Sequence, residues 1–128
     1  MKQFGKYLLK NRKMRDEDWW FGIFVVSICL TILLDCLLTL EGLSLGLEEG
    51  NKLVVLLMNM IGVKETLISI TIGSILGVII GLTYLRAKLK KENQIRALYV
   101  LIGMSLAYRT FVIGMWVGMI RLKLFMLN

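Results

Sequence analysis

The feature that most constrains this chain is a series of three apolar runs, at residues 19–40, 66–85 and 97–120. An α-helix rises about 1.5 Å per residue, so about 20 apolar residues cross a hydrocarbon core of about 30 Å. The whole chain has 128 residues, of which 57% are hydrophobic. This is more apolar surface than one small soluble core can bury. The sequence therefore predicts an all-α integral membrane protein with three transmembrane helices, in a single membrane domain.

The positions of the basic residues predict the topology. Lys and Arg concentrate in cytoplasmic segments beside membrane spans. Here they fill residues 1–18 and the connector 86–96, whereas the loop 41–65 carries more acidic than basic residues. We therefore expect the protein in the cytoplasmic membrane with its N-terminus inside and the C-terminal tail, residues 121–128, outside. Arg121 and Lys123 in that tail oppose the rule but are outnumbered.

The net charge of +7 fits a membrane partner better than a nucleic acid. The basic residues are sorted by topology rather than spread over one face, and anionic lipid on the cytoplasmic side attracts such segments. We therefore expect contacts with anionic membrane lipids and no nucleic-acid binding. Residues 1–18 fit either a short amphipathic helix on the inner leaflet or a flexible tail.

The stretch 53–63 is apolar but only about half as long as a membrane span. One interpretation is an interfacial or re-entrant half-helix that precedes the second span. The other is a single tilted helix of over 30 residues that projects from the membrane. We favour the half-helix, because Asn59, Gly62, Lys64 and Glu65 gather where a turn would separate it from the span.

Few residues suit metal, cofactor or redox chemistry. The chain has no histidine, and its two cysteines, Cys29 and Cys36, lie seven residues apart in one apolar run. That spacing is about 10 Å on a helix, too far for a disulfide, so we interpret both as buried apolar residues. No nucleophile has a base beside it, and Gly42-Leu-Ser-Leu-Gly46 lacks the strand and the histidine of a nucleophile elbow. We expect neither an enzyme nor a bound cofactor or metal.

Two charges fall inside the predicted spans, and such charges are costly in lipid. Counted from the inner ends of their spans, Asp35 lies about 24 Å and Arg109 about 18 Å across the membrane. An arginine side chain reaches over such an offset, so the sequence predicts an intramembrane pair between the first and third spans. Lys64 is a rival partner for Asp35. A structural clamp, an ion or proton relay, and a contact to a partner or a lipid headgroup all remain open as roles.

Small and polar residues also recur at helical spacing. Ser27, Thr31, Asp35 and Thr39 form a polar stripe that is expected to face protein rather than lipid. Glycines repeat every fourth residue on the second and third spans, a spacing that lets membrane helices approach closely. These glycines are Gly73, Gly77, Gly81, Gly114 and Gly118. We expect Gly77 to pack against the third span and the glycines of that third span to contact a partner or a second copy.

The residues Asp35, Thr39, Gly42, Gly46, Glu49 and Asn51, followed by Lys64 and a basic connector, form a D-x3-T-x2-G-x3-G-x2-E-x-N pattern. This pattern resembles a family of small, uncharacterised three-span membrane proteins of archaea and bacteria. The resemblance covers about two-thirds of the chain, and it departs from the family at Lys52, where proline is usual. It implies a prokaryotic three-helix protein whose Asp35, Glu49 and Asn51 form a polar cluster near the outer face, where Lys64 and Glu65 also lie.

Taken together, these features favour a small non-catalytic membrane subunit that packs against larger membrane proteins and stabilises their complex. Short spans, glycine faces and little mass outside the membrane fit this role. The alternative is a homo-oligomeric channel or carrier for ions or small solutes that uses Asp35 and Arg109. In either case we expect self-association or a larger protein partner.

Overall fold

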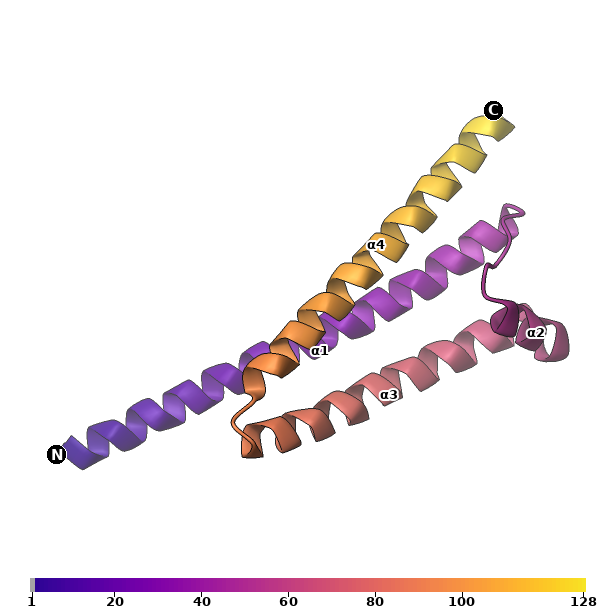
Figure 1. The fold of residues 1–128 in the computed structure, drawn as a ribbon. Coiled ribbons are helices and arrows are strands. Elements are labelled where there is room, and N and C mark those ends of the chain that lie inside the picture. Colours follow the sequence, from indigo (N-terminus) through magenta and orange to yellow (C-terminus); the bar gives the residue numbers. More distant parts are fainter. Residues whose placement is uncertain (1) are drawn as a thin grey trace.

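The computed structural model describes residues 2–128, apart from the side chains of residues 2, 4, 7–9 and 11–15. The fold is all-α, as predicted, and consists of four helices in the order α1 (Lys2–Ser44), α2 (Lys52–Ile61), α3 (Val63–Lys91) and α4 (Ile95–Leu127). The three long helices lie side by side, and the short α2 stands at one end of them (Figure 1).

Three stretches are long and apolar enough to cross a membrane, namely Asp16–Ser44, Val63–Lys91 and Ile95–Leu127. They contain the three predicted spans and extend beyond them at both ends. Most of their large apolar side chains are exposed, including Leu30, Ile80 and Phe111. Such surfaces suit a lipid environment, so the fold is consistent with a membrane-embedded helical protein.

The basic N-terminal segment is not separated from the first span. Helix α1 runs without a break from Lys2 to Ser44, so residues 2–18 continue the axis of the span. The segment is thus helical, as in the first of the two interpretations, and it continues the helix of the span instead of forming a separate short helix. No proline or glycine pair interrupts the chain at this point, and a helix that has already formed extends at low cost.

Helices α2 and α3 are separate, as the turn-forming residues predict. Gly62 lies between them with φ of 102°, a backbone conformation that side chains with a Cβ rarely adopt. Asn51 caps the start of α2, since its side-chain oxygen accepts a hydrogen bond from the Leu53 N–H at 3.1 Å. A single helix running through residues 53–85 is therefore absent. The second long helix begins at Val63, so it includes Lys64 and Glu65.

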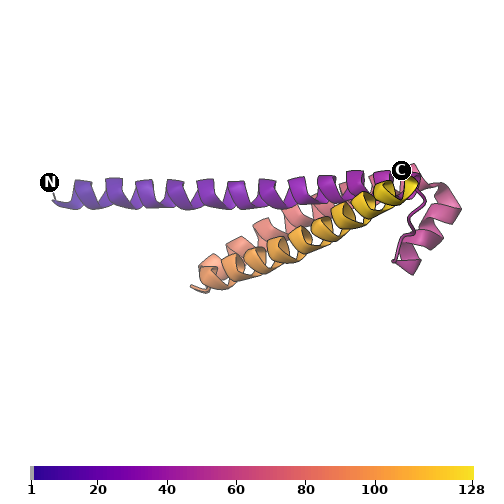
Figure 2. The ribbon, with the colours of Figure 1, turned by 90° about the horizontal axis from the view of Figure 1, so that it is seen from above.

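The turn 92–94 reverses the chain between α3 and α4. Both helices lie against α1, and Figure 2 shows α1 crossing the α3–α4 pair at an angle. Helices α3 and α4 lie closest at the turn and spread apart toward their other ends (Figure 1), whereas the N-terminal part of α1 leads away from the turn. We call the part formed by residues 16–32, 75–91 and 95–106 the basic half, and the part formed by 35–44, 52–74 and 109–127 the α2 half.

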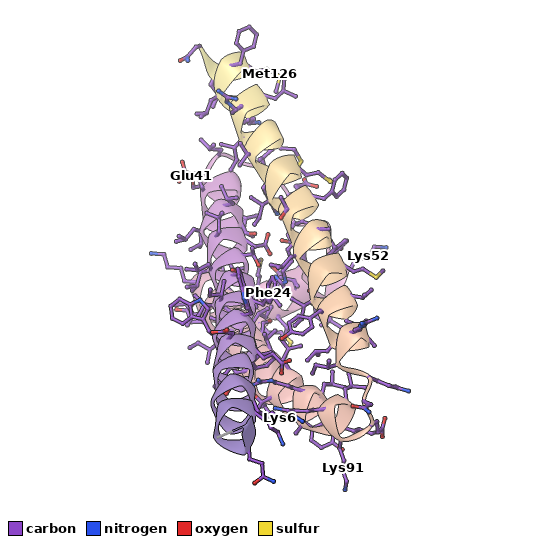
Figure 3. The ribbon with its side chains drawn as sticks, turned by 90° about the vertical axis from the view of Figure 1, so that its left-hand side faces the viewer. Lys6, Phe24, Glu41, Lys52, Lys91 and Met126 are labelled. Carbon is purple, nitrogen blue, oxygen red and sulfur yellow. The ribbon has the colours of Figure 1, made fainter. Side chains whose placement is uncertain are left out.

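The apolar core lies in the basic half. It contains the buried side chains of Phe21, Ile28, Ile32, Leu98 and Ile102. Partly buried residues from all three long helices pack around them, among them Phe24. Figure 3 shows Phe24 between α1 and α4, where its ring meets Tyr99 edge-on with centroids 5.8 Å apart. This core fixes the crossing of α1 on the other two helices.

Candidate functional site

The α2 half contains a polar cavity at the level of Asp35 and Arg109. Its volume is about 230 Å³, and residues of all four helices and of the loop before α2 line it. The polar lining consists of Asp35, Thr39, Glu49, Asn51, Thr71, Ser74 and Arg109. The expected offset in depth between Asp35 and Arg109 does not separate them, because α1 and α4 cross at an angle and both residues border the same space.

The charges of the first and third predicted spans, Asp35 and Arg109, share the cavity without a direct bond. Oxygen Oδ1 of Asp35 is buried and has no hydrogen-bond partner. Among the described side chains, no carboxylate oxygen lies within 4.0 Å of the Arg109 guanidinium. The ion pair that the described residues do form joins Arg86 and Asp18 in the basic half. A charge in an apolar medium is costly unless it is paired or solvated. The site is thus electrostatically incomplete within one chain.

A second cavity lies on the seam between α1 and α4. It has a volume of about 210 Å³ and is lined by Asp35, Tyr108, Arg109 and Val112, with no contribution from α3. Tyr108 is 68% exposed. Asp35 and Arg109 therefore border two spaces, one shared with α3 and one lined by α1 and α4 alone.

Of the predicted polar stripe, only Thr39 is buried. Its hydroxyl donates to the Asp35 carbonyl oxygen at 2.8 Å, while Ser27 and Thr31 donate to the carbonyl oxygens of Ile23 and Ile28. These bonds satisfy the hydroxyl donors within α1 itself. The three hydroxyl groups therefore need no polar neighbour on another helix. Asp35 is the one member of the stripe whose side chain lacks a partner.

The predicted polar cluster near α2 divides into two parts. Glu49 and Asn51 line the cavity, and a Glu49 carboxylate oxygen accepts the Asn51 N–H at 3.0 Å. Lys64 and Glu65 are exposed at the start of α3, on the far side of the Gly62 turn, and are absent from the cavity lining. Lys64 forms no ion pair with Asp35.

The cysteines do not form a reactive pair. Cys29 and Cys36 are half-buried free thiols, and the Cys36 Sγ lies 3.9 Å from the Leu67 carbonyl oxygen on α3. Among the described residues, no group of three or more Cys, Asp and Glu lies close enough together to hold a metal ion.

The glycine faces differ from the expectation for α3. A Cβ built at Gly73, Gly77 or Gly81 would meet nothing within 4 Å, so these glycines are not pressed against another helix of the chain. Gly77 and Gly81 instead line an apolar groove between α3 and α4. Gly114 and Gly118 are also free of neighbours within 4 Å.

Two tight contacts were not predicted from the sequence. A Cβ at Gly42 would lie 2.5 Å from the Trp116 ring, so this glycine makes room for the Trp116 side chain of α4 against α1. Asp18 pairs with Arg86, and the Arg86 guanidinium lies 4.5 Å from the centre of the Phe21 ring. The Asp18–Arg86 pair could have been predicted from the sequence, because Asp18 directly precedes the first apolar run and Arg86 directly follows the second, so both are expected at the same side of the membrane.

Comparison with known proteins adds no relative: no family model, no curated protein and no solved structure matches the chain.

Proposed function

We propose that this protein is a small non-catalytic membrane subunit that packs against a larger membrane protein through the seam between α1 and α4. The observation that carries the proposal is the incomplete charge pair at that seam. Asp35 Oδ1 has no hydrogen-bond partner, and Arg109 has no carboxylate within 4.0 Å among the described side chains. A polar side chain of a partner in the seam cavity would satisfy both groups and lower their cost in lipid.

The surface around the seam supports the same role. Tyr108 and Phe111 are exposed large side chains close to the cavity, and aromatic residues are frequent anchors at interfaces. Gly114 follows on the same helix, where an absent side chain allows a partner helix to approach. An anchor, a polar contact and a close approach are thus available along about two turns of α4.

The test is purification of the tagged full chain from its native membrane in a mild detergent. We expect a partner in constant stoichiometry with the wild type. Asp35→Asn and Arg109→Gln should each lower its recovery by about tenfold or more, because each removes a charged group that the polar side chain of the partner would bind. Glu65→Gln is the matched control, since it makes a similar change at an exposed position. Recovery of the wild type as a lone monomer would contradict the proposal.

We further propose that the protein lies in the cytoplasmic membrane with its basic end inside. The support is the concentration of Lys and Arg in residues 1–18 and 86–96. In a chain carrying Cys29→Ala and Cys36→Ala, Asn51→Cys should react with a membrane-impermeant maleimide on intact spheroplasts. Lys91→Cys should react only after lysis. The reverse pattern would overturn this orientation.

A homo-oligomeric channel or carrier is the second candidate, favoured by the polar cavity of about 230 Å³. Asp35, Thr71 and Ser74 line it at the middle of the spans, and Glu49 and Asn51 line it beside the loop before α2. Such a lining offers a path for ions or small polar solutes. In this role the unpartnered Asp35 oxygen binds the transported species.

This candidate predicts flux in liposomes. With a potassium diffusion potential and an internal pH-sensitive dye, the wild type should conduct protons, and Asp35→Asn should abolish the flux while inserting and assembling normally. Ser27→Ala, whose hydroxyl bonds only within α1, should leave the flux unchanged. A wild-type flux equal to that of empty liposomes excludes proton conduction, and equal flux in Asp35→Asn excludes the role of Asp35.

A further inference from the structure

The groove between α3 and α4 has no assigned role. Its volume is about 470 Å³, and its walls are mainly apolar. Gly77, Gly81 and Leu85 form much of the α3 wall, while Leu101 and Ile102 belong to the α4 wall. The groove therefore opens in the basic half, away from the seam on which the proposed function rests.

The dimensions of the groove suit a lipid chain. Its α3 wall extends from Ser74 to Leu85, and eleven residues of helix rise about 16 Å. This length matches the depth of one leaflet, about half of a 30 Å hydrocarbon core. At the deep end lies Arg109, which also lines the polar cavity, and at the shallow end lies the turn 92–94. An acyl chain that enters from the basic end thus fits the groove along its length.

The charges at the shallow end indicate the headgroup. Lys88 follows Leu85 by three residues and Gly81 by seven, so it continues the groove face of α3 beyond the apolar wall. Lys88 is exposed, whereas the neighbouring Arg86 is engaged with Asp18 and Phe21. Basic pockets between helices at this depth bind anionic headgroups. A phosphate held by Lys88 would place its acyl chain at the mouth of the groove.

We propose that the groove between α3 and α4 binds one acyl chain of an anionic phospholipid whose phosphate is held by Lys88. The acyl chain packs against Gly77 and Gly81, which have no neighbour within 4 Å of a Cβ position, and it contacts both α3 and α4. The inference is independent of the proposed function, because the groove shares only Arg109 with the seam cavity.

The test uses native mass spectrometry of the full chain in detergent with equal amounts of phosphatidylglycerol and phosphatidylcholine of identical chains. We expect one retained lipid, with phosphatidylglycerol preferred. Lys88→Gln should lower that preference about fivefold. Lys91→Gln is the matched control, because Lys91 lies about 4.5 Å farther along the helix from the groove and points away from the helices at the turn (Figure 3). It should change the preference less than about twofold.

The groove itself is tested by filling it. The double variant Gly77→Leu, Gly81→Leu keeps every charge and should lower retention of both lipids about tenfold or more, since the added side chains occupy the space of the acyl chain. Gly118→Leu, the same change on α4 outside the groove lining, should retain lipid as the wild type does. Both should show wild-type helix content, since leucine has a higher helix propensity than glycine.

Three results would overturn the proposal. The first is undiminished lipid retention in the double glycine variant, and the second is an equal loss of preference in Lys88→Gln and Lys91→Gln. The third is a wild-type dimer that the double glycine variant loses while lipid retention stays unchanged, which would assign the groove to a second copy.

Discussion

The two halves of the bundle use opposite means to hold the same three helices. In the basic half, Phe21, Ile28 and Ile102 belong to a continuous apolar core, and the Asp18–Arg86 pair joins α1 to α3 beside it. In the α2 half, a polar cavity occupies the space between the helices, and Asp35 has an unpaired buried oxygen. Among the described residues, the basic half has no buried side-chain N or O atom without a hydrogen-bond partner, whereas the α2 half has one, Asp35 Oδ1.

The difference bears on the proposed function. A buried polar atom without a hydrogen-bond partner costs free energy, and the proposed partner contact at Asp35 would remove that cost. The α2 half nevertheless has its own packing contact, the Trp116 ring against Gly42. We therefore expect substitutions of packing residues to act on stability in both halves, and substitutions of cavity residues to act mainly on binding.

The largest effect on stability is expected for Gly42→Leu. A Cβ there would lie 2.5 Å from the Trp116 ring, which is itself buried, so α1 and α4 must separate. We expect a loss of about 3 kcal/mol in the free energy of unfolding. Reversible unfolding in mixed micelles measures it, with Gly118→Leu as the control at a glycine that has open space. An equal, small change in both variants would show that the Gly42 contact does not hold the α2 half together.

A smaller loss, about 2 kcal/mol, is expected for Ile102→Ala in the basic half. Ile102 is 1% exposed and lies in the core cluster. In lipid an unfolded helix exposes Ile102 to acyl chains rather than to water, so the substitution loses little hydrophobic free energy. The cost comes mainly from lost dispersion contacts, and the value falls at the low end of the usual range. Val100→Ala, at a position that is 60% exposed, is the control. Equal effects of the two variants would show that the basic half has no specific core.

The sequence predicts the fold class, the three spans and the turn before α3, because these depend on local features. Apolar length defines a span, and Gly62 interrupts a helix wherever a positive φ is required. The continuity of α1 from Lys2 is a different matter. Charge and apolar spacing describe residues 1–18 as a segment with its own character, but they do not determine whether the helix breaks before Trp19.

The site is predicted only in part, for reasons of geometry. Membrane depth brings Asp35 and Arg109 to one level, but it does not fix the crossing angle on which a direct bond depends. The glycines are a similar case, since spacing identifies a face of α3 without identifying what covers it. The contact of Gly42 with Trp116 joins residues 74 positions apart, and no local pattern encodes such a pairing.

Asp35→Asn should change the stability of the isolated chain by less than about 1 kcal/mol, because the substitution removes no hydrogen bond or ion pair of that side chain. A double-mutant cycle with Arg109→Gln measures the coupling directly. We expect a coupling energy below about 1 kcal/mol, together with the loss of partner recovery described above. A coupling well above this value would show that the two charges form a closed structural pair, and the contrast between the halves would disappear.

The smallest effect is expected for Asp18→Asn at the end of the basic core. The Asp18 side chain is 62% exposed, so water and salt screen its attraction to Arg86. Arg86 also keeps its contact with the face of Phe21, which does not depend on the carboxylate. We expect the unfolding midpoint to fall by a small fraction of the shift for Ile102→Ala, and the difference from wild type to vanish in high salt. Arg86→Gln removes both contacts and should lower the midpoint further. If Asp18→Asn instead lowers the unfolding midpoint as much as Ile102→Ala, the ion pair contributes as much as the apolar core to the stability of the basic half. The two halves would then both depend on charged groups, and the contrast between them would be lost.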